Sequence, residues 1–266
     1  MLTNLVSLFL LFAMQAAPVP KPSPNLAGIA HVAFHVTNVH KSRDFYHTLG
    51  FEEAFAFNDA GKPPVSYVKV NDRQFIELYQ RKDDSESLGL MHICYEANDL
   101  EALHGYYVQQ GIDVREPRKA RAGNLLFVFH DPEGQTLEFT QYMPGSLHYE
   151  ARGKHLGTNR ISEQMVRPTM PVKDLEAEHS FFKKLGFEDA GSQHGIRLRL
   201  AGESGEEIEL KNAGAPTQVV FIVPDVKRAA SELSQRELKP RENAESVSVT
   251  DPDGVVVVFA RGDTAQ

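Results

Sequence analysis

The sequence lacks the cysteines, the excess of basic residues and the long apolar runs that mark several large classes of protein. Its single cysteine, Cys94, cannot form a disulfide within the chain, so cysteine usage does not identify the redox compartment. The formal net charge is -8 at pH 7, whereas a protein that holds phosphate backbones needs clustered lysine and arginine. We therefore expect no nucleic-acid partner.

Sequence motifs for phosphate binding or acyl transfer are also missing. No glycine-rich loop that could cradle a phosphate group and no nucleophile elbow occurs. The most apolar segment, LVSLFLLFAM, has ten residues and is too short to span a bilayer. With 266 residues, however, the chain is long enough for two domains that each have a core.

The N-terminal segment resembles a secretory signal peptide. The apolar run is followed by QAAP, whose small residues suit cleavage after Ala16 or Ala17. We expect residues 1–17 to be a signal peptide and residues 18–27 to be an extended, proline-rich spacer. The mature protein would then be periplasmic or extracellular, without a membrane span. It would be cytoplasmic if the apolar run is only a frayed tail.

Four strand-helix-strand-strand-strand (βαβββ) units follow one another along the rest of the chain. In the first, IAHVAFHV alternates like a half-buried strand, and a helix follows that Asn38 can cap and Gly50 can end. The second starts at LMHICYEA, and Asp99 caps its helix. SRDFYHTLGFEEA is echoed by EHSFFKKLGFEDA, and HDPEGQTLEF by TDPDGVVVVF, so the whole half is duplicated. We expect an α+β protein with domains at residues 28–143 and 164–262 and a linker at 144–163.

Four residues that suit a divalent metal recur at matching points of the first two units. Each unit has a histidine in its first strand and a glutamate in its last: His31 and Glu77, then His92 and Glu138. Two neutral imidazoles and two carboxylates balance a divalent charge and leave two octahedral positions open for water or a bidentate substrate. Nickel, cobalt, zinc, manganese or ferrous iron would fit. Alternatively, these could be hydrogen-bonded strand histidines and glutamates that line a wet groove.

The second half keeps only part of this set. Through the echoes, Arg167 stands at the position of His31, and Glu209 at that of Glu77. Gln218 and Val258 replace His92 and Glu138. Arginine keeps its proton and valine offers no donor atom. We therefore expect one metal ion per chain and a second half that is a structural partner.

Several residues near the predicted ligands have less specific interpretations. His35 and Glu96 lie four residues beyond a predicted ligand, too far along the strand to bind the same ion, so we expect them in the pocket wall. Cys94 could border the site, although a free cysteine is usually a small buried apolar group. We assign three aromatic residues to the core by default: Phe75, Tyr79 and Phe139.

The segments HVAFHV, SRDFYHTLGF, FIEL, MHICYEANDL and DPEGQTLEF resemble the vicinal oxygen chelate superfamily. Its members include glyoxalase I, methylmalonyl-CoA epimerase, extradiol dioxygenases and bleomycin-resistance proteins. The resemblance implies two tandem glyoxalase-like domains in which paired units curl into open, barrel-like sheets around a metal. A homodimer is compatible with it, because paired units can exchange between two chains. The fold hosts many chemistries and does not identify the reaction.

The leading functional expectation is a metal-dependent, glyoxalase-like lyase, isomerase or epimerase that acts on a small carbonyl substrate. The metal would polarise the carbonyl while Glu138 or Glu77 moves a proton on the adjacent carbon. One alternative is an extradiol-type ring-cleaving dioxygenase with ferrous iron, although two-domain members of that kind carry their ligands in the C-terminal half. The other is a non-catalytic, bleomycin-resistance-like protein that sequesters a ligand.

Overall fold

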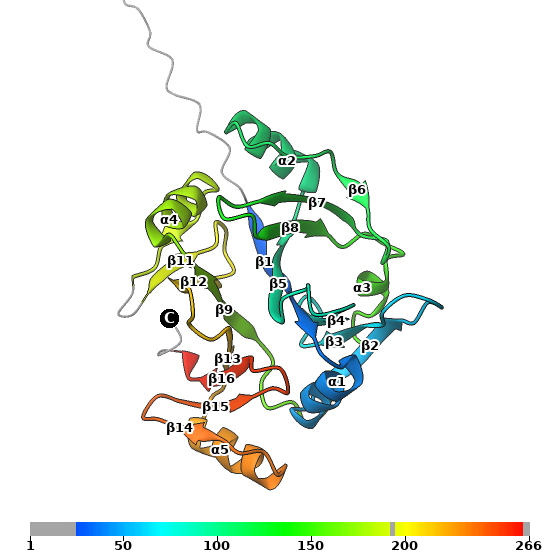
Figure 1. The fold of residues 1–266 in the computed structure, drawn as a ribbon, viewed down its shortest axis with the longest axis vertical. Coiled ribbons are helices and arrows are strands. Elements are labelled where there is room, and N and C mark those ends of the chain that lie inside the picture. Colours follow the sequence, from blue (N-terminus) through cyan, green and yellow to red (C-terminus); the bar gives the residue numbers. More distant parts are fainter. Residues whose placement is uncertain (1–24, 192–194, 263–266) are drawn as a thin grey trace, which may run out of the picture.

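The computed structural model describes residues 25–191 and 195–262 and contains two eight-stranded sheets, one in each half of the chain (Figure 1). The strand order of the first is β2-β3-β4-β1-β5-β8-β7-β6, and the second repeats it as β10-β11-β12-β9-β13-β16-β15-β14. Each half is built from two βαβββ units. The predicted fold class, α+β with four such units in two tandem domains with open sheets, is confirmed.

The elements of the first half are β1 (Leu26–Val36), α1 (Val39–Thr48), β2 (Glu52–Phe57), β3 (Val65–Lys69), β4 (Phe75–Gln80), β5 (Gly89–Ala97), α2 (Leu100–Gln109), β6 (Arg118–Lys119), β7 (Leu125–His130) and β8 (Thr136–Gln141). A short helix, α3 (Leu147–Glu150), follows. The second half contains β9 (Met165–Val172), α4 (Leu175–Lys184), β10 (Glu188–Asp189), β11 (Ile196–Arg199), β12 (Glu207–Asn212), β13 (Gln218–Ile222), α5 (Val226–Gln235), β14 (Arg241–Glu242), β15 (Ser246–Thr250) and β16 (Val256–Ala260).

Local sequence explains where the four longer helices begin. Each starts after an Asn or Asp residue whose side chain accepts a hydrogen bond from a backbone N–H of the first turn, which would otherwise lack a partner. These capping residues are Asn38, Asp99, Asp174 and Asp225. After α1, Gly50 has a φ of 89°, a conformation that favours glycine. None of the helices in the described part of the chain has the length and apolarity needed to cross a membrane.

Strand β1 begins at Leu26, so the last two residues of the expected spacer belong to the sheet. The Leu26 side chain is buried, and its backbone N–H donates to the carbonyl of Ala201 at 2.9 Å. This contact comes from the second half, which local sequence patterns do not reveal. The predicted signal peptide and the first part of the spacer lie outside the described residues.

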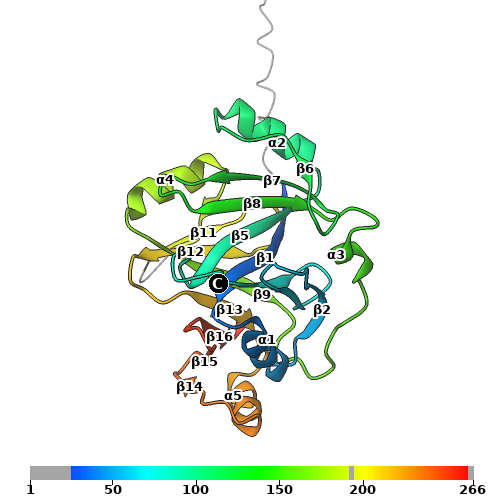
Figure 2. The ribbon, with the colours of Figure 1, turned by 45° about the vertical axis from the view of Figure 1, so that its right-hand side comes forward.

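The two halves share one hydrophobic core. Buried residues of both belong to a single cluster, in which Tyr95 packs against Phe187 at a ring-centroid distance of 5.3 Å. The ring centroids of Phe51 and Phe221, one from each half, are 5.4 Å apart. Strands β1 and β9, the first strands of the two halves, are in contact (Figure 2). The second half therefore supports the back of the sheet that carries the predicted ligands.

Candidate metal centre

The register of four adjacent strands arranges the predicted ligands on one face of the first sheet in two rows. One row contains His31 of β1, Cys94 of β5 and Glu138 of β8, and the next contains Glu77 of β4, Ala33 of β1 and His92 of β5. The apolar residues between them along β1, such as Val32 and Phe34, face the core instead. Strand alternation thus directs the polar set to the inner face of the curled first sheet, which we call the cup (Figure 1).

Two small residues separate the ligand candidates within these rows. Ala33 lies between Glu77 and His92, and Cys94 lies between His31 and Glu138. Both small side chains are fully buried. Larger residues at these two positions would fill the space in which imidazole and carboxylate groups approach one another.

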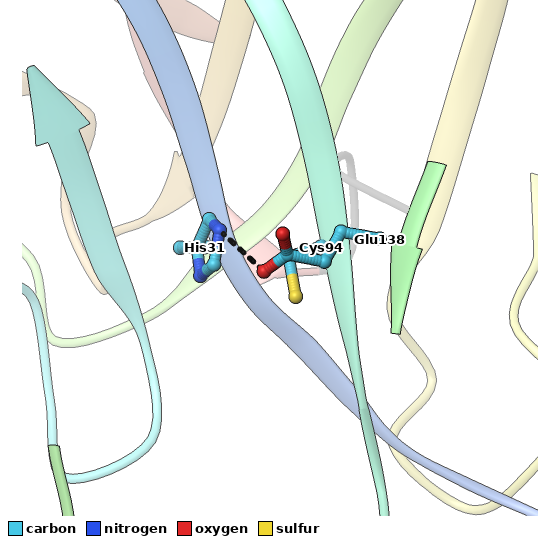
Figure 3. Close-up of side chains that lie close together, drawn as sticks. All are labelled: His31, Cys94 and Glu138. Carbon is cyan, nitrogen blue, oxygen red and sulfur yellow. Dashed lines mark ion pairs between the residues drawn. The ribbon is translucent and has the colours of Figure 1, made fainter. Parts of the chain in front are cut away.

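His31 is the residue around which the other three gather. Its Nε2 lies 3.0 Å from His92 Nε2. The same atom lies 3.6 Å from Glu138 Oε1, a contact that Figure 3 shows beside Cys94. Its Nδ1 lies 3.2 Å from Glu77 Oε1. Two donor atoms that bind one ion at a right angle, with bonds of about 2.1 Å, are roughly 3.0 Å apart. The separation of the two histidine nitrogens therefore suits a shared metal ion.

Donor atoms within 4.8 Å of one another form two groups that share His31. One group contains His31, Glu77 and His92, and the other contains His31, Cys94 and Glu138. Each of the other three predicted ligands thus shares a group with His31, but Glu138 is not in the group that contains Glu77 and His92. Cys94 borders the site, as its position on β5 allowed, and burial raises the pKa of its thiol.

Burial shifts the pKa values of these groups in the direction of their neutral forms. It lowers the pKa of His92 to about 4, and it lowers the pKa of His31 well below the usual value. It raises the pKa values of Glu77 and Glu138 to about 8. Neutral imidazoles have a free lone pair at physiological pH. For Glu138, the charge of Arg118 lowers the pKa, but the opposite effect of burial is larger.

The residues fit a divalent cation. A cation would stabilise both carboxylates, which are otherwise costly to bury in charged form. The buried Nδ1 of His31 lies 3.2 Å from Glu77 Oε1 but forms no hydrogen bond in this arrangement. Two imidazole nitrogens with carboxylate oxygens suit zinc, iron, nickel, cobalt or manganese.

Tyr79 belongs to the site rather than to the core, which corrects its default assignment. Its hydroxyl donates to Glu77 Oε2 at 2.8 Å. Phe139 lies in the main core as predicted, whereas Phe75 belongs to a smaller cluster with Cys94 on the cup side. The first sheet therefore carries aromatic side chains on both faces.

The pocket-wall residues lie outside the two donor groups, as expected. Glu96 interacts with Arg73 at 3.9 Å and with Arg152 at 3.8 Å. The charge of His35 contributes to the lowered pKa of His92, so it lies near the site. Neither residue belongs to a group with metal-binding spacing.

His148 is a site residue that the sequence patterns did not indicate. Helix α3 lies in the predicted linker and places this side chain, which is 1% exposed, inside the cup. Its Nε2 is 3.6 Å from Glu77 Oε1. The one local signal is Ser146, whose side chain caps α3 by accepting from the N–H of Tyr149. Such a signal does not indicate where a helix of four residues will dock.

The second sheet has the same register but a different set of side chains. Glu209 pairs with Thr169 as Glu77 pairs with Ala33. Val220 pairs with both Arg167 and Val258, which matches the positions of His31 and Glu138 around Cys94; the sequence alignment of the halves is therefore correct.

Salt bridges occupy the position of the donor groups in the second half. The Arg167 guanidinium lies 3.5 Å from a Glu207 oxygen and 3.9 Å from a Glu209 oxygen. Among the described residues, groups with metal-binding spacing occur in the first half alone.

Comparisons with known proteins agree with this fold. Residues 28–139 match the family model of the Glyoxalase/Bleomycin resistance protein/Dioxygenase superfamily. Homoprotocatechuate 2,3-dioxygenase from Arthrobacter globiformis is similar over 91% of this chain and 82% of its own, with 16% identity and a TM-score of 0.66.

A Mn(II)-bound glyoxalase from Novosphingobium aromaticivorans is similar over 91% of this chain and 86% of its own, with 18% identity and a TM-score of 0.66. An extradiol ring-cleaving dioxygenase from B. fuscum is similar over 92% of this chain and 74% of its own, with 15% identity and a TM-score of 0.65. At such identities the likeness concerns the fold. No curated protein sequence matches the chain.

Proposed function

We propose that the first half is a metal-dependent lyase, isomerase or epimerase, since residues 28–139 match the family model of the Glyoxalase/Bleomycin resistance protein/Dioxygenase superfamily. It moves a proton on the carbon beside a carbonyl of a small oxygenated substrate. The observation that carries this proposal is the second carboxylate, because Glu77 Oε1 lies 3.2 Å from the same histidine that Glu138 approaches.

One divalent ion would be held by His31, Glu77, His92 and Glu138. When bound, it supplies a positive charge that polarises the substrate carbonyl and makes the neighbouring C–H bond more acidic. The two imidazoles are neutral at physiological pH and therefore offer lone pairs rather than protons.

Glu138 is the better placed of the two carboxylates to exchange a proton with substrate. Its side chain is 15% exposed, whereas that of Glu77 is 4% exposed. Tyr79 also restrains Glu77 by donating to its Oε2 at 2.8 Å. We assign the base to Glu138 and a supporting role to Glu77.

A second candidate function is ring cleavage by an extradiol-type dioxygenase with ferrous iron. Glu77 approaches His31 at Nδ1, whereas His92 and Glu138 approach it at Nε2. If Nε2 binds the metal, Glu77 could orient His31 from outside as a hydrogen-bond acceptor. Two histidines and one carboxylate would then hold the iron.

The two reactions differ in their need for oxygen. Metal-loaded protein would be screened in deuterated water against small carbonyl compounds and catechols, in air and under nitrogen. We expect turnover of a carbonyl compound without oxygen and uptake of deuterium beside the carbonyl. Glu138→Gln should block this exchange and Glu77→Gln should weaken it, while His40→Ala, at an exposed position on α1, should leave it unchanged.

Strict dependence on oxygen, with a ring-cleaved product from a catechol, would favour the dioxygenase. Because a shielded proton transfer can proceed without exchange, the oxygen dependence weighs more than the deuterium uptake. Tight binding of a small molecule with no turnover and no need for metal would instead favour the sequestering protein.

A further inference from the structure

His148 lies in an aromatic cage beside the candidate metal centre. Its ring stacks on Tyr142 at a centroid distance of 4.7 Å and with an interplanar angle of 6°. Phe75 and Phe55 meet it edge-on at 4.7 and 5.0 Å. Burying a polar imidazole among aromatic rings is costly unless its two nitrogens have partners. The partners available to these nitrogens therefore indicate its role.

Asn124 assigns a tautomer to His148, and the position of Glu77 is compatible with it. The side-chain amide of Asn124, which is buried, donates from Nδ2 to His148 Nδ1 at 2.9 Å. A neutral imidazole that accepts at Nδ1 carries its proton at Nε2. Nε2 has no hydrogen-bond partner, and Glu77 Oε1 lies 3.6 Å from it, just beyond hydrogen-bond distance.

The helix that carries His148 is fixed at both ends. At its start, the N–H of Leu147 donates to the carbonyl of Ala122 at 2.8 Å. Gly123 has a φ of 94°, and a Cβ there would lie 3.0 Å from Ser146 Cα, so the close approach favours glycine. At the other end, the buried Lys69 ammonium of β3 donates to the carbonyls of Ala151 and Lys154.

We propose that His148 is a positioning residue for Glu77. Its Nε2 lies 3.6 Å from Oε1 of that carboxylate, and the Tyr79 hydroxyl donates to Oε2. Together the two groups orient Glu77 toward the metal before the metal binds. A small movement of the carboxylate closes the 3.6 Å separation to a hydrogen bond. The inference rests on one part of the proposed function, that Glu77 serves a metal, and not on the type of reaction.

The test uses Mn(II) alone as the probe, with its affinity for the full-length, metal-stripped protein measured by calorimetry. His148→Leu should weaken Mn(II) binding by about 10- to 100-fold, as is typical when the partner of a ligand is lost. His148→Gln retains an N–H donor and should recover most of the affinity. Asn124→Leu should also weaken Mn(II) binding, because it removes the donor that keeps His148 in the tautomer with its proton at Nε2.

A double-mutant cycle separates positioning from general damage to the fold. In a Glu77→Gln background, His148→Leu should have little further effect on Mn(II) affinity, because the residue acts through Glu77. Fully additive effects, or unchanged affinity in His148→Leu, would overturn the inference while leaving the proposed function intact. A wild-type protein that binds no Mn(II) or other divalent metal would overturn both, whereas oxygen-dependent turnover would overturn the proposed function alone.

Discussion

Glu77 and Glu138 are two carboxyl groups whose raised pKa values link the site to the stability of the metal-free protein. Their folded pKa values are about 8, against 4.5 for an unperturbed glutamate. Between these values the folded state keeps protons that the unfolded state has released, so stability is lost as the pH rises. The buried histidines His31, His92 and His148 have lowered pKa values and act oppositely, but only below their usual value of 6.5.

From pH 6.5 to 8 the carboxyl groups therefore dominate. We predict that the free energy of unfolding of the metal-stripped protein, measured by urea denaturation, falls across this window. The fall should be smaller in a Glu77→Gln, Glu138→Gln variant, and part of it should remain because Glu206 has a pKa of about 7. Saturating Mn(II) should remove most of the fall. A stability that rises through the window would contradict the assigned pKa directions.

At the scale of elements, local sequence patterns predicted the strands, the helix caps and the repeated units. The alternation in β1, the caps of the helices and the repeated units are properties of neighbouring residues, and they placed His31, Glu77, His92 and Glu138 on equivalent strands. Helix α3 has four residues, and the position of His148 depends on Lys69, Gly123 and Asn124, which are distant in sequence. Tyr79 was misassigned because an aromatic residue in a strand gives no local sign of the carboxylate its hydroxyl binds.

The arrangement of the candidate ligands in rows across the strands allows a test by a substitution that removes no ligand. Ala33 lies between Glu77 and His92 and is fully buried. We expect Ala33→Leu to separate the two donors and abolish Mn(II) binding, and to cost about 1–3 kcal/mol of stability through overpacking. Binding would be measured by calorimetry and stability by urea denaturation.

The equivalent residue of the second half provides a matched control. Thr169 pairs with Glu209 at the same register and is also fully buried. Thr169→Leu should cost stability while Mn(II) affinity stays at the wild-type value. Equal loss of metal affinity in both variants would show that the effect comes from general destabilisation rather than from the row.

At the scale of the whole molecule, the second half retains burial after losing the ligand set. Its Phe187 and Phe221 complete the core behind the first sheet. The sequence echoes identified the duplication and the missing ligands. The sequence echoes did not reveal the joint core, because the apolar periodicity of each half is the same whether that half packs against its own helices or against the other half.

Glu206 makes a buried polar contact between the halves. Its buried carboxylate accepts from the N–H of Ile29 and from Gln74 Nε2, and it pairs with Arg73. We predict that Glu206→Ala lowers the free energy of unfolding by about 1.5–3 kcal/mol, because charged hydrogen bonds are lost and their donors lack a partner. The exposed Glu203 of the same loop is the control, and Glu203→Ala should be nearly neutral. Urea denaturation of both variants checks this, and equal stabilities would contradict the role of Glu206.

The central claim is that one cup, in the first half, holds one divalent ion around His31. Elemental analysis of the wild-type protein and of a His31→Ala, His92→Ala double variant, purified in parallel, tests it most directly, with His40→Ala as an exposed control. The account predicts about one divalent metal ion per wild-type chain and per control chain, and almost none in the double variant. Two ions per wild-type chain, or undiminished metal in the double variant, would contradict it.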